Sequence, residues 1–157
     1  ALAVAVWRAP SRATAPISLA LLGGGSYALP TDDANHANAG GARPVLLSFW
    51  ATSCPPCVRE VPILNALHRE LQARGLDVVA IAMPYDPPAN VFAFTQRLQV
   101  AYPVAFDLHG AAVRRFGIDA IPHTVLLDRT GKIAWRHLGL LNADAARAQA
   151  LRVLAQR

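Results

Sequence analysis

The sequence predicts an α/β fold in which a mixed central sheet is covered by helices on both faces. Strand-like apolar runs alternate with helix-like patterns along most of its 157 residues. Residues 124–128 and 132–139 form a β-hairpin pattern around a turn, which requires antiparallel pairing within the same sheet. Hydrophobic residues make up 54% of the chain, which provides enough apolar material for one packed domain.

Two short strands begin the predicted domain around a glycine-rich turn. Residues 17–22 (ISLALL) and 27–29 (YAL) flank the sequence GGGS. No Lys-Ser/Thr pair follows these glycines, so a hairpin turn is favoured over a phosphate-binding loop. Residues 30–44 are polar and indicate a loop. Residues 45–51 (VLLSFWA) are continuously apolar, which is typical of a central strand buried on both faces.

A helix is predicted after Cys54, because apolar residues recur there at spacings of three and four. Gly75 suits the end of this helix, and Pro62 inside it should produce a kink. The expected buried stripe consists of Val58, Val61, Leu64, Leu67 and Leu71.

The elements after this helix follow in regular order. The patterns predict a buried strand at 77–83, a helix at 91–100, a short strand at 103–107 and a short helix at 109–118, before the hairpin. Asn142 can cap a last helix. Its expected inner stripe consists of Ala145, Ala146, Ala150, Leu151 and Leu154.

The basic charge of the chain does not by itself indicate a nucleic-acid partner. The formal net charge is +5, and 14 of the 15 basic residues are arginines, with Lys132 as the exception. These residues are scattered, and no run of five basic residues occurs. We therefore expect no nucleic acid among the partners, and we expect the protein to be a monomer.

Cys54 and Cys57 are the only two cysteines and lie at the predicted strand-to-helix junction. A disulfide with this spacing closes too small a loop to stabilise the fold much. A structural zinc site needs four ligands, and the five histidines form no suitably spaced pair. A helix N-terminus stabilises a thiolate, so the pattern favours a reactive pair in which Cys54 attacks and Cys57 resolves.

Two further residues have more than one interpretation from the residues alone. Glu60 follows Cys57 by three positions, where an acid favours the helix dipole; partial burial would instead raise its pKa and allow it to transfer protons. Ile121–Pro122 precedes a predicted strand, and most such peptide bonds are trans.

Two stretches together resemble the thioredoxin superfamily, and within it the TlpA/ResA/CcmG(DsbE)-like membrane-anchored thiol–disulfide oxidoreductases. They are RPVLLSFWATSCPPCVREVPIL and FGIDAIPHTVLLDRTGKI, and the similarity extends over about residues 43–140. The resemblance implies a thioredoxin fold with an N-terminal β-hairpin addition. It also implies a cis Pro122 beside the cysteines and a proton-handling role for Glu60. The buried acid of ordinary thioredoxins would fall at Ser48 and is absent.

The same resemblance implies a location and a set of partners. Residues 1–16 are expected to be the remnant of an anchor or signal with a linker, and residues 17–157 the thioredoxin-like domain. The implied location is the bacterial periplasm, tethered to the inner membrane. The expected activity is reduction of a disulfide in an apocytochrome c or copper-site protein, with re-reduction by an upstream membrane thiol donor. No cofactor is expected beyond the Cys54–Cys57 disulfide.

The chain departs from the family pattern beside the cysteines. Ser53 stands where Trp is usual, and His123 stands where Thr is common. We expect His123 to be a solvent-facing rim residue; the alternative is a third ligand, with Cys54 and Cys57, for Cu(I). The expected substrate-binding residues are Ile121, Pro122, Trp50 and Pro55.

Three alternative functions use the same cysteine pair. The first is a disulfide-introducing oxidase, and the second is a Cu(I) metallochaperone that uses His123. The third is a peroxidase, prompted by Thr52 two residues before Cys54. The C-x-x-C spacing and the lack of a distant resolving cysteine argue against the third.

Overall fold

The computed structural model describes residues 16–31 and 43–156. Their strands form one seven-stranded sheet in the order β2-β1-β5-β4-β3-β6-β7. The strands are β1 Ser18–Leu21, β2 Ser26–Ala28, β3 Val45–Trp50, β4 Asp77–Ala82, β5 Val104–Phe106, β6 His123–Leu127 and β7 Ile133–Leu138. The helices are α1 Pro55–Gln72, α2 Pro88–Arg97, α3 Ala111–Phe116 and α4 Ala143–Leu154.

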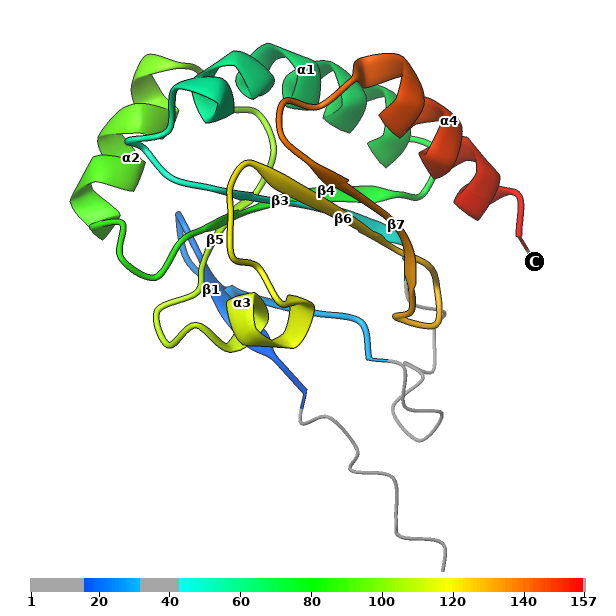
Figure 1. Ribbon diagram of the computed structural model, residues 1–157, viewed down its shortest axis with the longest axis horizontal. Helices are drawn as coiled ribbons and strands as arrows, with labels where there is room; N and C mark the ends of the chain where they lie inside the picture. Colours follow the sequence, from blue (N-terminus) through cyan, green and yellow to red (C-terminus); the bar gives the residue numbers. More distant parts are fainter. Residues whose placement is uncertain (1–15, 32–42, 157) are drawn as a thin grey trace, which may run out of the picture.

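The sheet is mixed, as the sequence predicts. Strand β3 pairs in parallel with β4 and antiparallel with β6, while β5 pairs in parallel with β4. Helices α1, α2 and α4 cover one face and α3 covers the other (Figure 1). The thioredoxin-like α/β architecture expected from the sequence is therefore confirmed.

Strand β3 lies inside the sheet between β4 and β6, and all six of its residues are buried. Its side chains alternate between the two faces. Leu46 and Trp50 contribute to the core under α1, α2 and α4, whereas Leu47 and Phe49 contribute to the core under α3. The chain therefore leaves β3 at the middle of one sheet edge and passes directly into α1.

Helices α2 and α3 differ from their predicted bounds, and α3, at Ala111–Phe116, is shorter than the expected 109–118. Helix α2 begins three residues earlier than expected, at Pro88, because a proline is well suited to the first helical turn. It also ends earlier, and Gln99 beyond it has a φ of 51°. In α1 the expected stripe is buried except for Val58, which is half-buried; Glu60 is buried instead.

The inner face of α4 is the clearest error in the helix predictions. Ala146 and Ala150 are buried as expected, but Ala145 is exposed and Val153, which was not predicted, is buried. The Asn142 side chain accepts a 2.9 Å hydrogen bond from the Ala145 amide, so the predicted N-cap is confirmed. Because Asn142 is the N-cap, the helix begins at Ala143, and Ala145 lies in its first turn on the side that faces solvent.

The N-terminal hairpin extends the sheet at one edge. Strands β1 and β2 pair antiparallel around the glycine-rich turn, and β1 pairs antiparallel with β5. The loop expected at 30–44 falls largely outside the described residues, as does the expected anchor remnant at 1–16, so the domain boundary stays a prediction. Within residues 16–31 and 43–156, no helix is long and apolar enough to cross a membrane.

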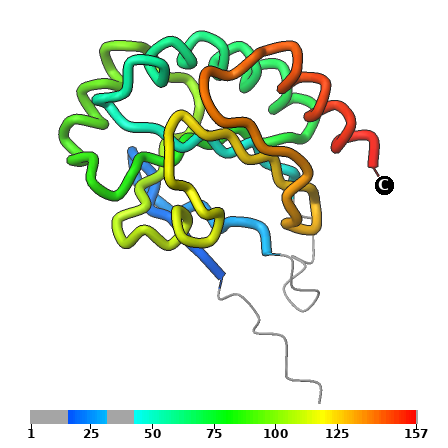
Figure 2. The backbone as a smooth tube through the Cα atoms, in the orientation of Figure 1, coloured from blue at the N-terminus to red at the C-terminus, as the bar shows by residue number. Residues whose placement is uncertain are grey.

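The segment between β7 and α4 crosses back from the sheet to the helix layer. Figure 2 shows this orange segment rising from the end of β7 toward α1 before α4 begins. It brings residues 139–141 close to the first turns of α1, where the cysteines lie.

Candidate functional site

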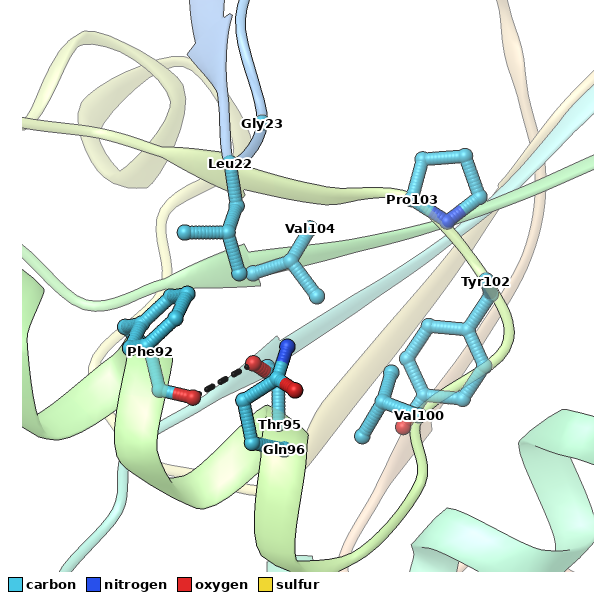
Figure 3. Close-up of a pocket in the computed structure, with 9 residues that line it drawn as sticks. All are labelled: Leu22, Gly23, Phe92, Thr95, Gln96, Val100, Tyr102, Pro103 and Val104. Carbon is cyan, nitrogen blue, oxygen red and sulfur yellow. Dashed lines mark hydrogen bonds between the residues drawn. The ribbon is translucent and has the colours of Figure 1, made fainter.

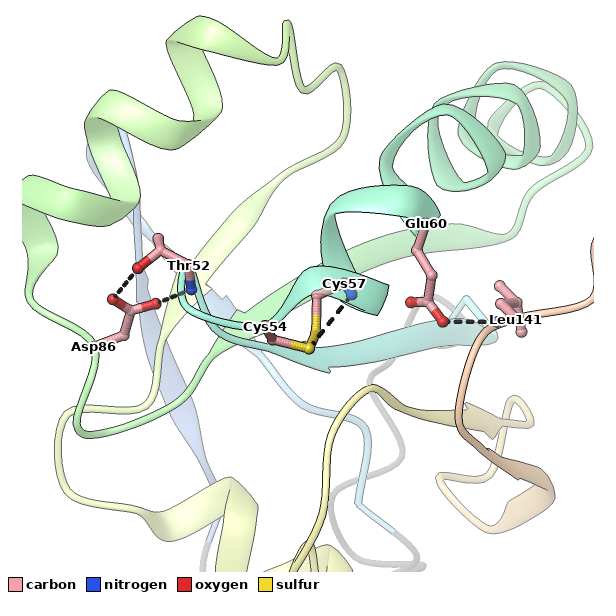
Figure 4. Close-up of a disulfide and its surroundings, with 6 residues drawn as sticks. All are labelled: Thr52, Cys54, Cys57, Glu60, Asp86 and Leu141. Carbon is pink, nitrogen blue, oxygen red and sulfur yellow. Dashed lines mark hydrogen bonds between the residues drawn. A yellow bond between two sulfur atoms is a disulfide. The ribbon is translucent and has the colours of Figure 1, made fainter.

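The disulfide between Cys54 and Cys57 lies where β3 passes into α1 (Figure 4). Cys54 is the N-cap residue of α1 and has an extended backbone, with φ −106° and ψ 104°. The two Cα atoms are 5.3 Å apart. Cys54 is 8% exposed and Cys57 3%, so the cysteine predicted to attack a substrate is the more accessible of the two.

The two prolines between the cysteines determine which backbone amide faces the sulfur. Pro55 and Pro56 occupy the first two helical positions and have no N–H group. Cys57 is therefore the first residue of α1 with an amide to donate, and this N–H points at Cys54 Sγ at 3.3 Å. The N-terminal end of α1 thus directs its positive potential and one hydrogen-bond donor at the Cys54 sulfur.

Glu60 lies one helical turn after Cys57 and is only 1% exposed. Its Oε1 accepts a 2.7 Å hydrogen bond from the Leu141 amide. Burial raises the pKa of the Glu60 carboxyl to about 7, although the Leu141 amide and the nearby Ser48 hydroxyl act in the opposite direction. The carboxyl group can therefore gain or lose a proton near neutral pH.

Within the described residues, three buried oxygen atoms on this face of the sheet have no partner in good hydrogen-bond geometry. They are Ser48 Oγ, Glu60 Oε2 and Thr124 Oγ1. Ser48 and Thr124 are directly opposite each other on β3 and β6, so their side chains lie on the same face. A carboxyl group that is protonated could donate to such a hydroxyl, whereas an ionised one cannot.

The Ile121–Pro122 peptide bond is cis, as the family resemblance implies. Pro122 is buried, and its carbonyl oxygen accepts a 2.9 Å hydrogen bond from the Gly139 amide. Gly139 has a φ of 93°, a conformation that favours glycine. The same turn that reaches Glu60 through Leu141 therefore also holds the proline loop through Gly139.

The other predicted substrate-binding residues differ in their exposure. Pro55, between the cysteines in sequence, is exposed, and Ile121 is half-buried. Trp50 is only 6% exposed, and its ring packs against Phe94 with centroids 4.7 Å apart. The substrate-binding role of these residues stays a prediction, and Trp50 has the least surface to offer.

His123 is not the solvent-facing rim residue that the sequence predicts. It is 8% exposed at the start of β6, because β6 lies inside the sheet between β3 and β7 and its neighbour Phe49 on β3 is buried. Burial, followed by the positive charge of Arg136, lowers the pKa of the His123 imidazole. Its Nδ1 atom is buried without a hydrogen-bond partner.

The alternative of a copper site formed by Cys54, Cys57 and His123 stays a hypothesis. Within the described residues, no three His, Cys, Asp or Glu side chains are placed to hold a metal ion.

One pair of site residues was not predicted. Asp86, 7% exposed, accepts a 2.6 Å hydrogen bond from the Thr52 amide and a 2.7 Å bond from the Thr52 hydroxyl (Figure 4). This contact fastens the loop before Cys54 to the loop between β4 and α2. An aspartate beside two prolines is an ordinary turn residue in sequence, so no signal there indicated the contact.

A surface hollow of about 280 Å³ lies away from the cysteines, between the β1–β2 turn, α2 and the chain before β5 (Figure 3). Its lining includes Leu22, Phe92, Thr95, Val100, Tyr102 and Val104. Tyr102 also interacts electrostatically with Glu60, because burial and then the Glu60 charge raise the pKa of its hydroxyl. The hollow contains none of the predicted site residues.

Comparison with known proteins agrees with this geometry. The sequence matches the Redoxin family over residues 27–154. It is 34% identical over 89 residues to the thiol–disulfide oxidoreductase ResA of Geobacillus thermodenitrificans, covering 57% of this chain and 51% of that protein. The chain thus spans about half the length of the curated relatives it matches.

Solved structures show the same fold. A protein described as a thiol:disulfide interchange protein DsbE from Chlorobium tepidum aligns with a TM-score of 0.74 and 28% identity, over 90% of this chain and 95% of that one. StoA from Bacillus subtilis aligns with a TM-score of 0.73 and 20% identity, over 87% and 96%. The predicted resemblance to TlpA/ResA/CcmG-like proteins of the thioredoxin superfamily is confirmed.

Proposed function

The chain belongs to the Redoxin family, and on this premise we propose that it is a thiol–disulfide oxidoreductase that mainly reduces disulfides in partner proteins. The observation that supports this most is the position of the Cys54–Cys57 disulfide at the N-terminus of α1, with a buried carboxyl group one turn later. A structural disulfide would need neither feature.

The first step of the proposed reaction begins from the reduced pair. The Cys54 thiolate, stabilised by the helix N-terminus and the Cys57 amide, attacks one sulfur of the partner's disulfide. A mixed disulfide forms between Cys54 and that sulfur, and the partner's other sulfur leaves as a thiolate that takes up a proton.

The second step releases the partner. Cys57 loses a proton and attacks the Cys54 sulfur, so that the Cys54–Cys57 disulfide forms and the second partner sulfur leaves as a thiolate. The partner has then gained two electrons, which the cysteine pair has lost. A dithiol donor must return two electrons to the pair before another cycle.

Glu60 is the proposed proton acceptor in the second step. Cys57 and Glu60 are three residues apart on the buried face of α1. A carboxyl group with a pKa near 7 can take a proton from a thiol and return it in the reverse step at neutral pH. Ile121 and Pro122 are proposed to line the groove for the partner's chain.

The partner and the location are proposed on family resemblance. The proposed substrate is an apocytochrome c or a copper-site protein, and the proposed donor is a membrane thiol protein. The proposed location is the bacterial periplasm, with attachment to the inner membrane through an N-terminal segment. The substrate, the donor and the location are proposed from what the family resemblance implies, beyond the thiol–disulfide chemistry itself.

The direction of electron flow is tested by the reduction potential of the Cys54–Cys57 pair. Equilibration with glutathione or dithiothreitol buffers, followed by thiol alkylation, gives the potential directly. A reductant is expected near the thioredoxin value of about −270 mV, whereas a value near the DsbA value of about −120 mV would make the protein a disulfide-introducing oxidase.

A further inference from the structure

The peptide group between Leu140 and Leu141 connects two titratable side chains. Its N–H, on Leu141, donates a 2.7 Å hydrogen bond to Glu60 Oε1. Its C=O, on Leu140, lies 2.9 Å from His137 Nε2. A carbonyl oxygen can only accept, so His137 must carry a hydrogen on Nε2 in this contact. One peptide group thus accepts from an imidazole and donates to a carboxyl group.

Such a chain of hydrogen bonds is cooperative. A donor on a carbonyl oxygen draws electron density from the peptide group and makes its N–H a stronger donor. The receiving group, Glu60, is 1% exposed, so water competes little with this bond. The His137 contact therefore strengthens the bond that favours the ionised form of Glu60.

His137 is itself held in place. Its ring stacks on Trp135, with centroids 5.6 Å apart and ring planes 17° apart. Both residues lie on β7, two positions apart, and therefore on the same face of the sheet. His137 is half-buried, which limits the freedom of its ring. A stacked ring directs Nε2 consistently toward the turn at residues 139–141.

We propose that His137 is a positioning residue for Glu60 and acts through the Leu140–Leu141 peptide group. Its importance for catalysis rests on the proposed function, but the coupling itself is a property of the folded protein. The other titratable groups near this chain are Tyr102, which interacts with the Glu60 charge, and His123, which interacts with Arg136, Asp119 and His137. Within the described residues, no charged side chain contributes to the shift at Glu60 itself.

The test is a ¹³C NMR titration of the Glu60 carboxyl group in the oxidised protein. His137→Phe keeps an aromatic ring against Trp135 but removes the donor, and should raise the Glu60 pKa by roughly 0.3 to 0.6 of a unit. His137→Gln retains an N–H donor and should return the pKa most of the way to the wild-type value. His109→Phe is the matched control on an exposed loop and should change nothing.

Two outcomes would overturn the proposal. One is an unchanged Glu60 titration in His137→Phe; the other is an equal shift in His137→Gln, which would assign the effect to ring packing. If His137→Phe does not fold, the Glu60 titration is followed in His137→Leu, which also lacks the donor and should show the same rise in the Glu60 pKa. The disulfide stays intact throughout, so failure of the oxidoreductase function would appear in the redox titration and leave this result unaffected.

Discussion

The Leu141 amide donates a 2.7 Å hydrogen bond to Glu60 Oε1 across 81 residues of sequence. The second oxygen of the Glu60 carboxyl group has no partner in good hydrogen-bond geometry within the described residues, although the Ser48 hydroxyl lies near the carboxyl group. One bond does not replace the water that an ionised carboxylate loses on burial. Burial therefore favours the protonated form of the Glu60 carboxyl. This should affect both the free energy of unfolding and the rate of disulfide exchange.

The first prediction concerns stability and pH. Between about pH 4.5 and 7 the folded protein binds more protons at Glu60 than the unfolded chain does, because folding raises this pKa. Ionised Glu60 should therefore lower the free energy of unfolding progressively as pH rises through this window. Glu60→Gln keeps an acceptor for Leu141 and places a donor near the unpartnered Ser48 and Thr124 hydroxyls.

Urea unfolding of the oxidised proteins measures this effect. Glu60→Gln should be more stable than wild type at pH 8 by about 1 to 3 kcal/mol, with a much smaller difference near pH 4.5. A variant that is less stable than wild type at pH 8 would show that Glu60 is stabilised in its ionised form.

The second prediction concerns the rate of disulfide exchange. Without a carboxyl group to accept the Cys57 proton, Glu60→Gln should resolve mixed disulfides at least about tenfold more slowly at pH 7. The pH inflection near 7 that Glu60 contributes should also disappear. Stopped-flow mixing of reduced protein with a disulfide substrate gives both quantities. Glu70→Gln, a matched substitution in the last turn of the same helix, should keep the wild-type rate and pH profile. An identical loss of rate in Glu70→Gln would remove Glu60 from the mechanism.

The third prediction concerns the contact between Thr52 and Asp86. Thr52→Val preserves the shape of the side chain but leaves a buried Asp86 oxygen without its hydroxyl donor, and should cost about 1 to 2 kcal/mol of unfolding free energy. Thr52→Ser retains the hydroxyl and should cost markedly less. Thr95→Val controls for the substitution itself, because the Thr95 hydroxyl donates to the Phe92 carbonyl in its own helix. Equal losses of unfolding free energy in Thr52→Val and Thr95→Val would argue against a specific contribution of the Thr52–Asp86 contact.

The fourth prediction concerns the cap of α4, which directly follows the turn that holds Glu60. Asn142→Ala removes the acceptor for the Ala145 amide and should lower the unfolding free energy by about 1 kcal/mol. Asn142→Asp keeps a capping oxygen and should behave like wild type. Thermal unfolding of both variants distinguishes these cases, and equal melting temperatures for the two would mean that the cap contributes little.

Much of the fold was predictable because local patterns and the tertiary structure agree. The continuous apolar run of β3, the helix pattern after Cys54 and the hairpin at β6 and β7 each appear where expected. The helix ends were less predictable. Helix α2 begins earlier than predicted because Pro88, and not the apolar spacing, sets its start. Val153 was missed because its neighbours Leu151 and Leu154 were assigned to the inner stripe, and both are only half-buried.

The site was only partly predictable for a physical reason. Cys54, Cys57 and Glu60 are close in sequence, so helix geometry alone places them together. The contacts of Asp86 with Thr52 and of Leu141 with Glu60 join distant loops, and neither residue type indicates such a role. His123 was expected at the surface, because its burial depends on the place of β6 between β3 and β7, which the local sequence does not indicate.

The attack order at the cysteine pair is the central claim and is tested most directly by trapping. Cys57→Ser leaves the Cys54 thiol without its resolving partner, so mixed disulfides with partner proteins should accumulate and disappear on reduction. Cys54→Ser is the matched control and should trap none. Non-reducing gels of cells that express each variant, with mass spectrometry of the adducts, give the result. Adducts on Cys57 in Cys54→Ser, with none on Cys54 in Cys57→Ser, would contradict the account.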